Sequence, residues 1–84
     1  MSIIFVTGST QGLGRATAEH LIAQGHQVVL HARSAERIAS LAEIQSKAFG
    51  VVVGDLSEIS EIYQVAEQVN KIGKMNVVIH NAGV

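Results

Sequence analysis

The chain has 84 residues, which is long enough for one small domain and too short for two. Its apolar content of 48% supports a packed core and excludes a disordered segment. With 6 Lys and Arg against 7 Asp and Glu, it carries no basic field for nucleic acid or an anionic membrane, so any phosphate must be bound locally. The lack of cysteine excludes disulfides and thiolate metal sites and is compatible with the cytoplasm, where we expect the protein. No apolar run approaches the length of a membrane span.

Four short apolar runs predict strands of the kind that is buried on both faces of a parallel sheet. They are residues 3–6, 27–30 with an extension towards 32, 51–53 and 77–79. In the three stretches between them, apolar residues recur at helical spacing. Leu13 begins the first apolar stripe and Gly25 lies at the expected C-cap of that helix, while Ser34 is placed to cap the second. The third helix is expected to start at Ser57 and to stop at Gly73.

Strand and helix thus alternate as β-α-β-α-β-α-β along the chain. This order predicts parallel pairing with right-handed crossovers, because each helix must return the chain to the same end of the sheet. We therefore expect an α/β fold with a Rossmann-type parallel sheet, in a single domain over residues 1–84 and with no second domain.

Three glycines, Gly8, Gly12 and Gly14, lie between the first strand and the first helix. Without a Cβ they permit positive φ angles and a close approach of a ligand to the main chain, and the free N–H groups at the helix start suit a pyrophosphate. The spacing T-G-x-x-x-G-x-G excludes a Walker loop, because no lysine precedes Lys47. It also differs from G-x-G-x-x-G, because position 17 is Thr17. The alternative is a plain strand-to-helix turn.

This spacing resembles the turn of the short-chain dehydrogenase/reductase family, and two further motifs add to the resemblance. Asp55-Leu56 follows the third strand, where the family carries an acidic residue that contacts adenine, and Asn81-Ala82-Gly83 follows the fourth, where the family carries N-A-G. The resemblance implies a strand order of 3-2-1-4 and a dinucleotide site made by the turn and both later motifs. The turn residues expected to bind the cofactor are Gly8, Ser9, Thr10, Gln11, Gly12, Leu13 and Gly14.

Other roles are open for some of these residues. Asp55 could instead cap the third helix, and Asn81 could tie the fourth strand to its neighbour, with or without contacting the cofactor. His80 stands where the family commonly has Asn before N-A-G. No metal site is expected, because the four histidines have no metal-ligand spacing, and we place them in solvent or at the edge of the core. They are His20, His26, His31 and His80.

The end of the second strand bears on the choice of dinucleotide. NAD-binding units carry an acid there for the ribose 2′-hydroxyl, but the matching position is Ala32, and Arg33 follows it. A guanidinium would grip the 2′-phosphate of NADP, and Ser34 could add a neutral donor. A charged hydrogen bond is worth about 1.5–3 kcal/mol, or one to two powers of ten in affinity. We therefore expect NADP, with NAD as the alternative cofactor and a plain surface arginine as the alternative role.

The residues that would carry out the chemistry are missing. Family members transfer hydride with a serine, a tyrosine and a lysine, the last two in Y-x-x-x-K, but Tyr63 is the only tyrosine here and Glu67 stands four residues later. We place Tyr63 in the third helix, covering core, and assign no catalytic residue. The chain matches only the front portion of the longer family members.

Two classes of function follow. The chain is either the front fragment of an NADP-dependent oxidoreductase or a complete, non-catalytic nucleotide-binding module; we favour the fragment. The resemblance implies a carbonyl or alcohol substrate for the parent enzyme, which we expect to be a homo-oligomer with no nucleic-acid or membrane partner. The fourth strand should form an open edge, and apolar surface of the first and fourth strands should face water. We therefore expect the chain alone to self-associate, to pair with missing segments or to be partly molten.

Overall fold

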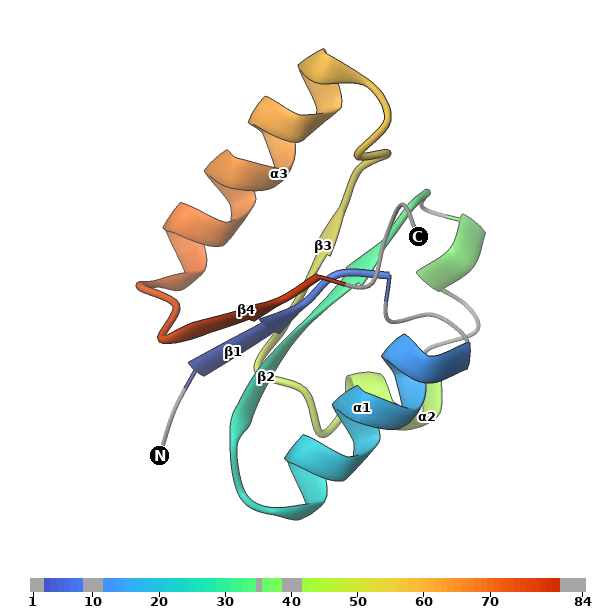
Figure 1. Cartoon of the computed structure of the whole chain (residues 1–84), viewed down its shortest axis with the longest axis vertical. Helices are drawn as coiled ribbons and strands as arrows, with labels where there is room; N and C mark the ends of the chain where they lie inside the picture. Colours follow the sequence, from blue (N-terminus) through green and yellow to red (C-terminus); the bar gives the residue numbers. More distant parts are fainter. Residues whose placement is uncertain (1–2, 9–11, 35, 39–41, 81–84) are drawn as a thin grey trace.

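The computed structural model describes residues 3–8, 12–34, 36–38 and 42–80. Its elements in chain order are β1 (Ile3–Val6), α1 (Gly12–Ala23), β2 (Gln27–Ala32), α2 (Ala42–Gln45), β3 (Gly50–Val53), α3 (Ile59–Ile72) and β4 (Val77–Ile79). The strands form one parallel sheet in the order β3-β2-β1-β4. Helices α1 and α2 lie on one face of the sheet and α3 lies on the other (Figure 1). The predicted α/β fold and its strand order are confirmed.

The core has two layers, one on each side of the sheet. Alternate residues of the central strand β2 supply both layers, because successive side chains of a strand point to opposite faces. Val28 and Leu30 pack towards α1 and α2, whereas Val29 packs towards α3. All three are fully buried, and burial of such a side chain stabilises the fold by about 1.5–3 kcal/mol. In the ranges that the structure covers, no helix is both long and apolar enough to cross a bilayer.

Helix α1 ends as its sequence predicts. Gly25 has a φ of +91°, and its N–H donates to the carbonyl of Ile22 at 3.0 Å. The next N–H, from His26, donates to the carbonyl of Leu21 at 3.1 Å, which completes a Schellman motif. At the other end of the helix, Leu13 is 75% exposed, so its expected place in the apolar stripe was wrong.

The segment after β2 differs from the single helix predicted to begin at Ser34. Residues 36–38 form a 3₁₀ turn, and the α-helical part that the structure describes, α2, is four residues long. The N–H of Arg37 donates to the backbone carbonyl of Ser34 at 3.1 Å, and the N–H of Lys47 donates to that of Ile44 at 3.0 Å. Both bonds span three residues, a tight geometry that does not propagate into a long helix.

Helix α3 begins later than expected and buries only its second half. Its N-cap is Glu58, without a side-chain capping bond, rather than Ser57. Val65 is buried, and Val69 and Ile72 pack beside it on the sheet. Tyr63 is 71% exposed, so the expectation that it covers core was wrong. The first turns of the helix extend past the end of β3 and have no sheet beneath them (Figure 1).

The two edges of the sheet differ. At the β3 edge, the side-chain amide of Gln68 from α3 behaves like a neighbouring strand: Val53 N–H donates to its Oε1 at 2.9 Å, and its Nε2 donates to the Val53 carbonyl at 2.8 Å. At the other edge, β4 is exposed at Val77 and Val78. The prediction that β4 carries open apolar surface is confirmed, whereas β1, which was expected to share that exposure, is buried from residue 4 to residue 6.

We predict that the 84-residue chain on its own self-associates through the β4 edge, because Val78 is 58% exposed there. Val78→Lys should lower the mass measured by light scattering, since a charge on an edge strand opposes edge-to-edge pairing. Ser60→Lys, which adds the same charge to the exposed start of α3, is the control and should leave the mass unchanged. A monodisperse monomer with a sharp thermal melt for the unsubstituted chain would contradict the prediction.

A second prediction concerns Gly54, which follows β3 and lies close to α3. A Cβ on Gly54 would collide with the side chain of Val65 and would lie 3.2 Å from the backbone oxygen of Glu61. Gly54→Ala should therefore lower the free energy of unfolding by about 1–3 kcal/mol, measured by urea denaturation. The same substitution in a Val65→Ala chain should cost less, because the methyl group that blocks the new Cβ is gone. Equal costs in the two backgrounds would show that the collision is not the cause.

Candidate dinucleotide site

The residues that follow the strands gather at one edge of the sheet, because the carboxyl ends of parallel strands lie together. The glycine turn follows β1, Arg33 follows β2, and Gly54 and Asp55 follow β3. His80 comes directly after β4. Hydrogen bonds connect the residues at these four strand ends, so this edge of the sheet is a connected polar structure.

Gly8 and Gly12, at the two ends of the glycine turn, have the backbone conformation that the sequence predicts. Gly8 and Gly12 both have a φ of +63°, a left-handed conformation in which other residues are strained. A Cβ on Gly12 would meet nothing within 4 Å, so the space beside the first residue of α1 is open. Gly14 is buried and Leu13 is exposed at the same helix start. The first main-chain N–H groups of a helix have no acceptor within the helix, so the start of α1 is suited to an anion.

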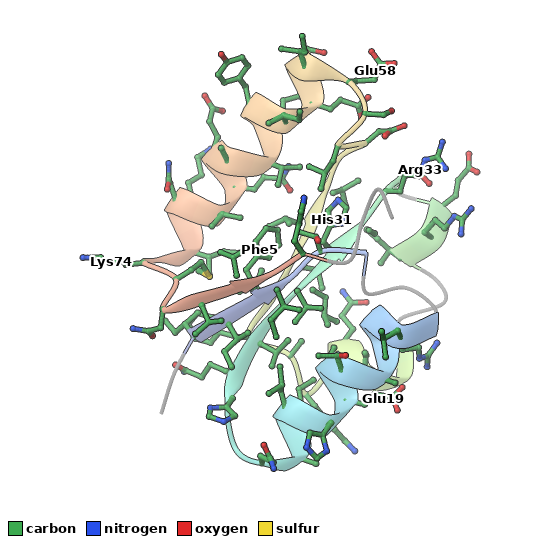
Figure 2. All side chains as sticks on the ribbon, in the orientation of Figure 1. Phe5, Glu19, His31, Arg33, Glu58 and Lys74 are labelled. Atoms are coloured by element: carbon green, nitrogen blue, oxygen red, sulfur yellow. The ribbon has the colours of Figure 1, made fainter. Side chains whose placement is uncertain are left out.

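His31 lies under this turn and was not recognised from the sequence. The N–H of Gly8 donates to its Nδ1 at 2.9 Å, and its Nε2 lies 2.7 Å from the carbonyl oxygen of Gly54. The side chain is only 2% exposed, and its ring stands edge-on to that of Phe5, with 6.3 Å between the ring centroids. Figure 2 shows His31 inside the molecule near the strands, whereas Arg33, two residues later, lies at the periphery. The expectation that the histidines lie in solvent or at the core edge was wrong for His31.

Burial lowers the pKa of His31 below its usual value. The hydrogen bond to Gly54 and the charge of Asp55 act in the opposite direction, and His80 adds to the lowering. The hydrogen bonds agree with a neutral ring, because Nδ1 accepts a proton from Gly8 and must itself carry none. The proton on the ring is therefore assigned to Nε2, which donates to Gly54.

A second connection joins β1 to β4. The N–H of Thr7 donates to the carbonyl of Ile79 at 2.9 Å, and the Thr7 hydroxyl oxygen lies 3.1 Å from Nδ1 of His80. Thr7 is buried although it is polar, and these bonds satisfy it. The first residue of the T-G-x-x-x-G-x-G motif thus fixes the turn to the fourth strand.

Two residues expected to bind the cofactor, Arg33 and Asp55, contact each other. Arg33 Nε lies 3.3 Å from Asp55 Oδ2, and the arginine side chain is 68% exposed. Asp55 Oδ1 accepts hydrogen bonds from the N–H of Ser57 at 2.9 Å and from its hydroxyl at 2.7 Å. The Ser57 bonds, with a smaller contribution from Arg33, hold the pKa of Asp55 below its usual value. The carboxylate therefore forms a turn with Ser57 and does not cap α3, whose N-cap is Glu58.

The other expected residues divide into two groups. Leu56 is partly buried and packs against the core layer beneath α3, so its side chain belongs to the core. The remainder lie outside the described residues: Ser9, Thr10, Gln11, Asn81, Ala82 and Gly83. Of the other histidines, His20 and His80 are exposed and His26 is partly buried. Within the described ranges, no group of three or more His, Asp or Glu side chains could hold a metal ion.

The described residues fit a dinucleotide at this edge. The turn provides main-chain N–H groups beside open space at Gly12, and the N-terminus of α1 carries a partial positive charge that attracts phosphate. Arg33 is exposed at the end of the neighbouring strand, where a guanidinium can meet a second anionic group.

The chain is similar in sequence to known oxidoreductases. A family model described as short chain dehydrogenase matches residues 2–84. An uncharacterized oxidoreductase of Emericella nidulans is 53% identical over 81 residues, and a short-chain dehydrogenase of Gibberella zeae is 42% identical over 83 residues. These alignments cover 96% and 99% of the chain but only 32% of each relative. The chain thus spans about a third of the length of the curated relatives it matches.

Solved structures share the fold. The Pseudomonas aeruginosa RhlG/NADP active-site complex superposes with a TM-score of 0.87 at 24% identity, a likeness that concerns the fold alone. An actinorhodin polyketide ketoreductase variant with NADPH superposes with a TM-score of 0.80 at 30% identity. Each comparison covers 99% of this chain, and 34% and 33% of the respective structures. The match of the family model to nearly the whole sequence places the chain in the short chain dehydrogenase family.

Proposed function

We propose that this chain is the cofactor-binding portion of an NADP(H)-dependent oxidoreductase that transfers hydride between the nicotinamide and a carbonyl or alcohol substrate. The observation that carries the proposal is the glycine turn, with left-handed Gly8 and Gly12 leading into α1 beside open space. The names of the relatives support the reaction class, since they are oxidoreductases and dehydrogenases. The ketoreductase structure with NADPH supports the cofactor class.

In this proposal the start of α1 holds the pyrophosphate by main-chain N–H groups and by the positive end of the helix dipole. Asp55 lies across the same edge, after β3, where it would face the adenine. The dinucleotide supplies the hydride that such a reaction needs, while the residues of this chain bind and orient it.

The preference for NADP over NAD rests on the end of β2. Ala32 is buried and offers no carboxylate for a ribose 2′-hydroxyl, and Arg33 beside it is exposed. The guanidinium already contacts Asp55, so a 2′-phosphate would compete with that carboxylate for Arg33. Because this competition reduces the gain, we propose a preference of about tenfold rather than a strict selectivity, with NAD as the alternative cofactor.

We assign no catalytic residue within the described site. The side chain of Tyr63 on α3 is largely exposed, and the residue four positions later is Glu67, where the family has a lysine. The carbonyl or alcohol substrate, a homo-oligomeric state and a cytoplasmic location all stay predictions.

The lack of a Y-x-x-x-K pair within these 84 residues favours one alternative, a stand-alone module that binds a nucleotide without catalysis. The two functions require polypeptides of different size: the oxidoreductase is longer than 84 residues, whereas the stand-alone module is not. The mass of the purified natural protein, together with the reading frame beyond Val84, decides between them.

We predict that Arg33→Ala lowers the affinity of the intact protein for NADPH by about tenfold and changes its affinity for NADH little, because only NADPH has the 2′-phosphate. Dissociation constants measured by the fluorescence of the bound cofactors test this. Lys74→Ala is the matched control, since Lys74 is an exposed cation at the far end of the molecule from Arg33 (Figure 2). Equal affinities for the two cofactors before substitution, or an unchanged preference after it, would disprove the assignment.

We also predict that the 84-residue chain alone reduces no aldehyde or ketone, because it lacks the serine, tyrosine and lysine set of the family. The assay is oxidation of NADPH, followed by absorbance with a panel of carbonyl substrates, and the control is the same reaction without the chain. Turnover by the pure chain above that control would show that a catalytic group within these residues has been overlooked.

A further inference from the structure

His31 is a buried, titratable side chain that the proposed function does not use. It lies beneath the glycine turn and connects that turn to the end of β3. We propose that His31 is a positioning residue for dinucleotide binding: it holds Gly8 in place through Nδ1, and its protonation loosens the turn and weakens binding. This inference rests on the proposed function, because it concerns the same turn.

Both ring nitrogens of His31 are engaged by main-chain groups. Nδ1 accepts from Gly8 N–H, and Nε2 donates to the carbonyl of Gly54. Main-chain partners leave the ring little freedom, because neither can rotate away as a side chain would. The single imidazole ring that bridges them thus sets the distance between the Gly8 N–H and the Gly54 carbonyl.

A second proton on His31 is incompatible with this arrangement. Once Nδ1 carries a proton it can no longer accept a hydrogen bond. Two donors, Nδ1–H and the Gly8 N–H, then face each other and repel. The Gly8 N–H, which is partly buried, then loses its acceptor on the buried His31 ring. Gly8 is the first glycine of the turn, so its movement displaces the point at which the turn begins.

The groups around the ring determine the pKa of His31. Asp55, after β3, favours the charged ring, whereas His80, after β4, disfavours it. On β1 the ring meets Phe5, which is apolar, and directly after the strand of His31, Arg33 is paired with Asp55. Burial is the largest effect and lowers the pKa. The neutral ring is therefore favoured in the folded protein, and its contribution to stability is complete above the usual histidine pKa of about 6.5 and is lost as the pH falls below it.

The test compares the unsubstituted intact protein with His31→Gln and His31→Leu at pH values from 5.5 to 8. Gln keeps an acceptor and a donor about as far apart as the ring nitrogens but does not titrate, whereas Leu fills the space without polar atoms. Dissociation constants for NADH are the main measurement, because the 2′-phosphate of NADPH has its own pKa near 6 (about that of other phosphate monoesters).

We expect the affinity of the unsubstituted protein for NADH to fall progressively as the pH decreases from 8 to 5.5, towards a loss of about tenfold when the ring is fully protonated, since one lost hydrogen bond to a buried group has that effect on an equilibrium. His31→Gln should bind nearly as well at pH 8 and should show little of this fall. His31→Leu should bind about tenfold more weakly at every pH. His20→Gln, which removes an exposed histidine of α1, should follow the unsubstituted protein, and His80→Gln should keep most of the pH dependence.

The same pH dependence in His31→Gln as in the unsubstituted protein would overturn the inference. A second measurement needs no cofactor: the ¹⁵N–¹H amide signal of Gly8 should shift with the protonation of His31 and stay constant in His31→Gln. If neither dinucleotide binds at any pH while the Gly8 signal titrates, the proposed function fails and the positioning of the turn by His31 stands. A Gly8 amide signal that does not change with pH contradicts the inference. If His31→Leu does not fold, the comparison of His31→Gln with the unsubstituted protein still tests it.

Discussion

The parallel pairing of β1 between β2 and β4 is the constraint on which the rest of the structure depends. Ile4 is matched with Val28 on one side and with Val77 on the other, and this register brings all the strand ends to one edge. Contacts between residues more than twenty positions apart in the chain, such as that of Gly8 with His31, exist only because of this pairing. The candidate site is therefore a product of topology, and each strand contributes one part of it.

The sequence predicted the fold well because the features that determine it are local. Runs of apolar residues marked the strands, and Gly25 and Gly73 marked the ends of α1 and α3. The α2 region was predicted poorly, because a short apolar pattern does not distinguish a regular helix from a succession of tight turns. Tyr63 was misplaced for a different reason: helical spacing shows which face of α3 is apolar but not how far the sheet extends beneath it.

The glycine turn of the site could be found from the sequence because glycine at fixed spacing has a direct conformational meaning. The hydrogen bonds that support this turn could not be found from the sequence. His31 stands in an apolar strand, and only the pairing with β1 and the end of β3 shows that its two nitrogens meet Gly8 and Gly54. One signal was available: a polar residue within a run buried on both faces needs partners for its polar atoms. The contact of Arg33 with Asp55 likewise depends on two strand ends being neighbours.

The side chain of Gln68 has a consequence for how copies of the sheet can combine. A fibre grows only if each molecule offers one strand edge to the next copy and a different edge to the previous one. At β3, the side-chain amide of Gln68 is hydrogen-bonded to both the N–H and the carbonyl of Val53. A strand from another molecule therefore cannot pair with Val53. Because β4 is exposed, we expect the 84-residue chain on its own to associate β4 against β4, a two-fold arrangement that uses the β4 edge of both copies. Aggregation by this route closes at a pair of molecules and does not extend into a filament.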